Sequence, residues 1–171
     1  VVSATLFVSN EALEEINKEL EVNPENLRSL YVRGLIQAGM GDFSEAEMDF
    51  SHFITWAPKE WAGYNDLAWV LAKQEKYAEA RDAILTAFGN IKGAGENAWL
   101  QNSVGVAYLN LKDYQNAQEA VLSAKAIAEK MNEGEWLAAY PGNNPEKTKE
   151  SFARFKEAIN LNLTRALVVD S

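Results

Sequence analysis

The sequence has no cysteine, one histidine and four prolines. Without cysteine the chain cannot form disulfides, thiolate nucleophiles or thiolate metal sites. With His52 as the only histidine, a zinc site would need carboxylates almost exclusively, which is uncommon for that metal. We therefore expect no cofactor and no metal, and we expect His52 to be a structural or surface residue.

Long apolar runs are also missing. The longest apolar stretches, such as VVSATLFV at residues 1–8, fall far short of the ~20 residues that a membrane-spanning helix needs. We expect no direct membrane insertion by these residues.

Basic residues are outnumbered, with 16 Lys and Arg against 25 Asp and Glu and a net charge of -9. This field repels phosphate backbones, so nucleic acid is not an expected partner.

The sequence shows no motif for catalysis. Gly93 and Gly95 lie in KGAGE, which matches neither the spacing of dinucleotide-binding loops nor that of phosphate-binding loops. No segment has oxygen ligands at the alternating positions of a calcium loop, and no nucleophile motif is recognisable. We therefore predict that the chain is not an enzyme.

The chain does contain an internal repeat. The phrase GDFSEAEMDF at residues 41–50 returns as EKYAEARDAI at 75–84 and as KDYQNAQEAV at 112–121. Ala46, Ala80 and Ala117 mark the phase, with spacings of 34 and then 37 residues. The three extra residues fit a loop in GNIKGAGEN at 89–97. A fixed period of this length indicates a repeat architecture.

Each unit has two helical patterns on either side of a short turn. The patterns predict helices over residues 27–40 and 44–56, 61–74 and 78–88, and 98–111 and 115–128. Small residues recur where two helices must approach closely: Gly34, Ala68 and Gly105 in the first helices, and Ala46, Ala80 and Ala117 in the second. Because Gly inside a helix costs about 1 kcal/mol relative to Ala, close packing is the expected reason. Each unit is therefore predicted to be a helical hairpin.

This pattern resembles the tetratricopeptide repeat family. The family has a small residue in the first helix, an aromatic residue after the turn, an alanine in the second helix and further typical residues toward the end of the unit. These positions are matched in the three units by Gly34, Phe43, Ala46 and Pro58, by Ala68, Tyr77, Ala80 and Ala87, and by Gly105, Tyr108, Tyr114, Ala117 and Ala124. Gln37 departs from the family's usual aromatic, and the second and third units lack the closing proline. The resemblance implies an all-α, right-handed α-solenoid with repeats at 27–60, 61–94 and 98–131.

Both ends extend the pattern. Ala12, Ile16 and Pro24 lie 34 residues before Ala46, Phe50 and Pro58, so residues 1–26 resemble the second helix of an earlier unit. VVSATLFV is then either a remnant of what preceded it or an ordinary N-terminal extension. Residues 132–171 are expected to hold a degenerate repeat and a capping helix.

The capping helix is expected to begin after the YPGNNP stretch, with Asn144 as its cap and Pro145 at its first position. It would bury an apolar stripe against the last repeat, formed by Phe152, Phe155, Ile159, Leu163 and Ala166.

In such an array the first helices line a concave groove. The resemblance places the peptide-binding positions at Arg28, Tyr31, Leu35, Asn65, Trp69, Lys73, Trp99, Asn102 and Val106. Asn amides can pair with peptide bonds, and Trp and Tyr offer apolar area with a polar tip. Trp69 or Trp99 could instead pack against a neighbouring helix or against the C-terminal capping helix. Some relatives hold a C-terminal carboxylate with Lys, Arg and Asn, but Tyr31, Leu35, Asp66, Trp99 and Ser103 stand at those positions, so this clamp is not expected.

The favoured function is a non-enzymatic scaffold that binds a protein or peptide partner in the groove. The first alternative is a self-assembling architectural component, which would make the protein a homo-oligomer. A further alternative is an accessory domain of a larger, membrane-tethered protein or of an enzyme.

Overall fold

The computed structural model describes residues 2–140, 143 and 145–168, and in them all regular structure is helical. The helices are α1 (Val2–Val22), α2 (Leu27–Met40), α3 (Phe43–Trp56), α4 (Trp61–Lys73), α5 (Tyr77–Asn90), α6 (Ala98–Asn110), α7 (Tyr114–Lys130), α8 (Glu133–Ala139) and α9 (Thr148–Leu167). Two short 3₁₀ turns, η1 (Ala94–Glu96) and η2 (Pro145–Lys147), complete the set. None of the described helices has the length and apolar character needed to cross a lipid bilayer.

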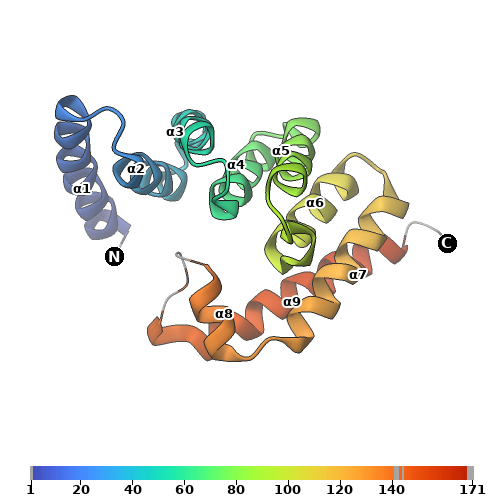
Figure 1. Ribbon diagram of the computed structural model, residues 1–171. Helices are drawn as coiled ribbons and strands as arrows, with labels where there is room; N and C mark the ends of the chain where they lie inside the picture. Colours follow the sequence, from blue (N-terminus) through green and yellow to red (C-terminus); the bar gives the residue numbers. More distant parts are fainter. Residues whose placement is uncertain (1, 141–142, 144, 169–171) are drawn as a thin grey trace.

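The predicted hairpins are present. The pairs α2–α3, α4–α5 and α6–α7 pack together, and each pair packs on the next. Their bounds lie within two residues of the predicted helices. Figure 1 shows the pairs following one another in an arc, with α3 and α5 on its outer side. The all-α solenoid prediction is confirmed.

The turn inside each hairpin uses one backbone conformation. Gly41 has φ 92°, and it ends α2 in the left-handed region. Glu75 and Lys112 stand at the same place in the second and third hairpins and have φ 62°. A non-glycine residue in this region costs about 1–2 kcal/mol. The turn geometry is therefore retained in all three units although only one of them has glycine there.

Close helix packing explains the small residues. A Cβ atom added to Gly34 would lie 2.8 Å from Cε1 of Phe50, and one added to Gly105 would lie 2.5 Å from Cγ2 of Val121. Phe50 and Val121 are fully buried, as is Ala117. Because these partners cannot move into solvent, a larger residue would push the two helices of a hairpin apart.

The extra residues between the second and third units lie where the sequence predicted them. α5 ends at Asn90, η1 occupies Ala94–Glu96, and Asn97 caps α6 by accepting from the backbone N–H groups of Trp99 and Leu100. The insertion therefore forms a short connection, and α5 and α6 still pack against each other.

The N-terminal segment is a single helix. Residues 2–9 belong to α1, which runs from Val2 to Val22. α1 packs on α2, where Leu20 is buried.

The C-terminal cap is present. α9 packs on α7 and α6 and buries Phe152, Ile159 and Ala166, with Phe155 and Leu163 partly buried beside them. The predicted start was wrong by one turn, because Pro145 begins η2 and α9 begins only at Thr148. The predicted cap, Asn144, lies outside the described residues.

Candidate functional site

The first helices of the three hairpins form one wall. α2 lies against α4, and α4 lies against α6. In Figure 1 this wall is on the side opposite α3 and α5, and α8 lies on the same side as the wall. We call the inward faces of α2, α4 and α6 the concave wall. The predicted groove residues come from these three helices.

A pocket opens between α2 and α4, and we call it the α2–α4 pocket. Its volume is about 340 Å³. It is lined by Leu35, Ala38, Gly39, Phe50, Asn65, Asp66, Trp69 and Tyr140. Most of these side chains are apolar or aromatic, and the few polar groups lie toward α4. Such a mixture is typical of sites that accept a small apolar group.

Trp69 is the most accessible aromatic residue of this pocket, with 45% of its surface exposed. Its ring meets Phe43 edge to face, with centroids 5.8 Å apart, and the Lys73 ammonium lies 5.2 Å from the Trp69 ring centre. The edge contact fixes the ring, and the cation adds a positive charge beside it. Trp69 and Lys73 therefore present an apolar face next to a cation.

Asp66 lies at the polar side of the pocket and is almost completely buried. The Tyr31 and Tyr140 hydroxyls each donate to its carboxylate at 2.6 Å, from α2 and from the residue after α8. Burial raises the pKa of Asp66, and the hydrogen bonds offset this only in part. Burial and the nearby Asp66 charge also raise the pKa of both tyrosines, so they remain hydroxyl donors.

The two predicted asparagines are engaged within the protein. Asn65 Oδ1 accepts a hydrogen bond from the Ser103 hydroxyl at 2.8 Å. Asn102 Oδ1 accepts from Asn162 of α9 at 3.0 Å. These bonds link α4 to α6 and α6 to α9. The amides are therefore part of an internal network, which limits their capacity to pair with a peptide backbone.

Trp99 belongs to an aromatic cluster at the α6 end of the wall. Only 9% of its surface is exposed. Its ring stacks on Phe155 of α9 at 4.7 Å and lies 5.5 Å from Trp61. Trp136 and Tyr140 lie over the other parts of the ring, at 6.4 Å and 6.3 Å. The C-terminal segment thus covers Trp99.

The nine predicted residues therefore fall into two groups. In the first group, Leu35, Trp69 and Asn65 line the α2–α4 pocket, and Lys73 lies beside it. Tyr31 contacts the pocket residue Asp66 through a hydrogen bond. Arg28 is exposed and Val106 is partly exposed. Trp99 and Asn102 are covered by or bonded to the C-terminal segment. The prediction gave no site role to Asp66, Trp61, Trp136 or Tyr140. In the sequence, only the concave position of Asp66 pointed to this region. Tyr140 lies 74 residues from Asp66 along the chain, so no local pattern joins the two residues.

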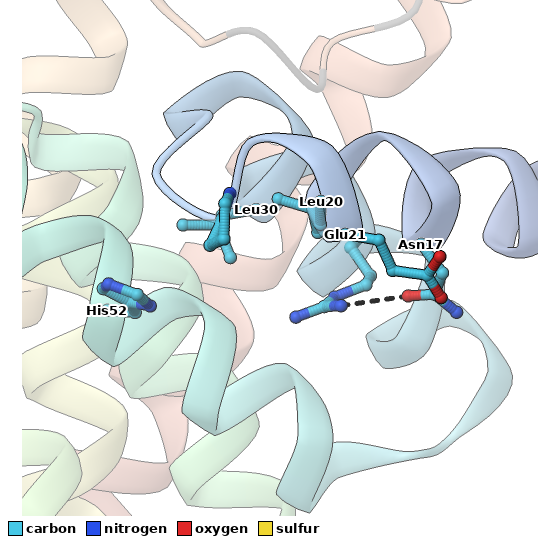
Figure 2. A pocket seen from close by; sticks show the side chains of 7 residues that line it. Asn17, Leu20, Glu21, Leu30 and His52 are labelled. Atoms are coloured by element: carbon cyan, nitrogen blue, oxygen red, sulfur yellow. Dashed lines mark hydrogen bonds between the residues drawn. The ribbon is translucent and has the colours of Figure 1, made fainter.

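A second pocket, of about 470 Å³, lies between α1, α2 and α3. It is lined by Asn17, Leu20, Glu21, Pro24, Leu30, Arg33 and His52. In Figure 2 Leu20 and Leu30 lie between His52 on one side and Asn17 and Glu21 on the other. The Arg33 guanidinium donates to both Asp49 oxygens at 2.7 Å and to Asn17 at 2.9 Å. This cation is already paired, and in the described residues no cluster of His, Asp and Glu could hold a metal ion.

Comparison with known proteins finds one repeat family that matches two of the three hairpins. The sequence profile named tetratricopeptide repeat matches residues 27–60 and 100–131. The chain carries tetratricopeptide repeats. The first matched interval has the bounds predicted for the first repeat. Among curated proteins, no sequence matches the chain.

Solved structures show the same tetratricopeptide repeat fold at low identity. A crystal structure of MamA protein is 16% identical, covers 96% of this chain and 84% of its own, and has a TM-score of 0.67. MamA from Desulfovibrio magneticus RS-1 is 18% identical, with coverages of 93% and 87% and a TM-score of 0.64. The TPR2B domain of yeast Sti1, solved in a complex with pHsp70, is 17% identical, with coverages of 79% and 96% and a TM-score of 0.57. At these identities the likeness concerns the fold.

Proposed function

We propose that the protein is a non-enzymatic scaffold that binds a segment of a partner protein on its concave wall. The observation that carries this proposal is the α2–α4 pocket, which joins apolar walls to the exposed ring of Trp69 and the adjacent Lys73. Two structures of similar fold support it, because yeast Sti1 TPR2B was solved with pHsp70 and PcrH with the chaperone-binding region of PopD.

The pocket also suggests what the partner presents. Leu35 and Ala38 on α2, with Phe50 beneath them, form an apolar surface, so an aliphatic or aromatic side chain would gain by burial there. Lys73 lies over Trp69, outside the apolar part, and would attract a carboxylate. The chain as a whole has a net charge of -9, so this basic position is distinct from the general surface. We expect a partner segment in which an apolar residue lies close to an acidic one.

A displayed library of random peptides tests the proposal without knowledge of the partner. Selected peptides should bind Trp69→Ala at least about tenfold more weakly than the wild type, since a buried aromatic contact contributes about 1.5–3 kcal/mol. Lys73→Glu should weaken only those peptides that carry the acidic residue. Trp56→Ala is the matched control, because Trp56 is also exposed, at 55%, but lies on α3.

Peptides that bind wild type, Trp69→Ala and Trp56→Ala equally well would show that the α2–α4 pocket is not the binding site. A loss of binding counts only where the melting temperature of Trp69→Ala stays within a few degrees of that of the wild type. Trp69 is a suitable position for this reason, since its exposed ring contributes little to the core.

Self-assembly is the second candidate, and exposed apolar side chains on the first and last helices favour it. Val22 of α1 is 88% exposed, and Leu161 and Leu167 of α9 are 62% and 49% exposed. Light scattering over a range of concentrations separates the two functions. A mass that stays at 19.0 kDa contradicts assembly, whereas a rising mass that Leu161→Ser lowers supports it.

A further inference from the structure

Part of the concave wall is occupied by the protein's own helix α8. Trp136 of α8 is buried at 3% exposure, and its ring stacks with that of Trp99 at 6.4 Å and 25°. Tyr140, the next residue after α8, places its ring 5.7 Å from Trp61 and 6.3 Å from Trp99. Tyr140 is the C-cap of α8, and its backbone is extended (φ -130°, ψ 126°). Trp136 on the helix and Tyr140 just past its end therefore contact the wall as an aromatic pair.

One hydrogen bond gives this contact its chemical specificity. The Tyr140 hydroxyl donates to Oδ1 of Asp66 at 2.6 Å, and Tyr31 occupies the other carboxylate oxygen. A phenylalanine could make the ring contacts but could not donate to Asp66. We call the surface formed by Trp61, Trp99 and Asp66 the aromatic slot. Its side chains select an aromatic residue on a short helix and a tyrosine just after the end of that helix.

The same contact also carries two unfavourable features. The Trp136 indole N–H is buried and has no hydrogen-bond partner among the described residues. The Asp66 carboxylate is buried where its charge is disfavoured. An unpaired buried donor and a desolvated carboxylate both cost free energy. α8 has only seven residues, so it is too short to be a stable helix by itself. These features reduce the net stability of the docked state.

We propose that the aromatic slot is a recognition site for a short helix that carries an aromatic residue and is followed, four positions after that residue and just past the helix end, by a tyrosine. α8 with Tyr140 is its intramolecular occupant, which such a partner displaces. This inference rests on the proposed function and names the partner's chemistry for one part of the same wall. Tyr140 also lines the α2–α4 pocket. A partner that replaces α8 would therefore extend directly toward Trp69.

Competition in trans tests this displacement with a defined probe. The probe is a peptide with the sequence of residues 132–140, NEGEWLAAY, acetylated and amidated at its ends. The receptors are the full chain and its Trp136→Ala/Tyr140→Ala variant, in which α8 cannot fill the slot. Calorimetric titration should give an affinity at least about tenfold higher for the variant. In the wild type the docked α8 lowers the fraction of molecules whose aromatic slot is free to bind the peptide.

Two altered peptides and one receptor control give the specificity. A peptide with phenylalanine in place of its tyrosine should bind the variant more weakly, because it cannot donate to Asp66. A peptide with alanine in place of its tryptophan should not bind measurably. Trp56→Ala, which removes an exposed tryptophan from α3, should bind the probe as the wild type does.

The double variant must first show a cooperative melting transition. If it does not fold, Tyr140→Ala alone replaces it, since Tyr140 is only partly buried, and the expected gain is then about threefold. A folded variant that binds no peptide, or that binds it no better than the wild type, would overturn the inference. This result would leave the α2–α4 pocket and the library selection untouched, so the two proposals fail separately.

Discussion

Asp66 is the residue whose environment most clearly sets a pH dependence. Burial raises its pKa in the folded protein, against the hydrogen bonds from Tyr140, Tyr31 and Asn65. The folded protein therefore keeps the proton at pH values where the unfolded chain has released it. The stabilisation is complete below the unfolded pKa of about 3.9, and it is lost as the pH rises through the raised pKa of the folded state.

Asp66→Asn should remove this dependence. We expect the free energy of unfolding of the wild type to fall relative to that of Asp66→Asn as the pH rises from acid to neutral, by at most about 1.4 kcal/mol per pH unit for one proton. Urea unfolding at a series of pH values measures both curves. Asp82→Asn is the control, because the Asp82 side chain is 61% exposed. Parallel curves for the wild type and Asp66→Asn would contradict the prediction.

Glycine at position 105 is required by packing. An added Cβ would lie 2.5 Å from Val121, which is fully buried. We expect Gly105→Ala to lower the free energy of unfolding by about 1–3 kcal/mol. Gly89→Ala is the matched control, since Gly89 is also helical and has no atom within 4 Å of its added Cβ. It should be neutral or slightly stabilising, and equal losses at both sites would refute the packing explanation.

At the scale of the element, the helical hairpins could be predicted because each one repeats the same local pattern. Phe43, Tyr77 and Tyr114 each begin the second helix of a hairpin, so three copies of one signal support each assignment. The position of α8 could not be predicted in this way. Tyr140, the residue after α8, contacts Asp66 from 74 positions away along the chain, and nothing in the local sequence specifies such a pair. Trp99 was predicted to line the groove, and its burial depends on this distant segment.

The cap of α8 provides a test at the same scale. Asn132 accepts from the Glu135 backbone N–H, and the Glu135 side chain accepts from the Asn132 N–H, at 3.0 Å and 2.9 Å. Asn132→Ala should cost about 1 kcal/mol. We expect faster amide exchange in residues 133–139 without change in α4 or α5. Asn132→Asp should keep the wild-type exchange rates because aspartate also caps helices. Equally accelerated exchange in both variants would show that capping is not the cause.

At the scale of the whole molecule, stability should vary along the array. Helices of a repeat protein are stabilised mainly by their neighbours. α4 packs against α2, α3, α5 and α6, whereas α1 packs chiefly on α2. We therefore expect slower amide exchange in α4 than in α1. Hydrogen exchange followed by mass spectrometry measures this gradient, and uniform protection from α1 to α9 would indicate a single cooperative unit.

The grouping of Trp61, Trp99 and Trp136 has a spectroscopic consequence. Their indole rings form a chain with centroid separations of 5.5 Å and 6.4 Å, close enough for their electronic transitions to couple. Coupled transitions give a paired positive and negative signal in the far-ultraviolet circular dichroism of the strong indole absorption band. Of these three indole rings, that of Trp136 belongs to α8. The protein thus contains an intrinsic optical reporter, whose signal would weaken when α8 leaves the wall, without any attached label.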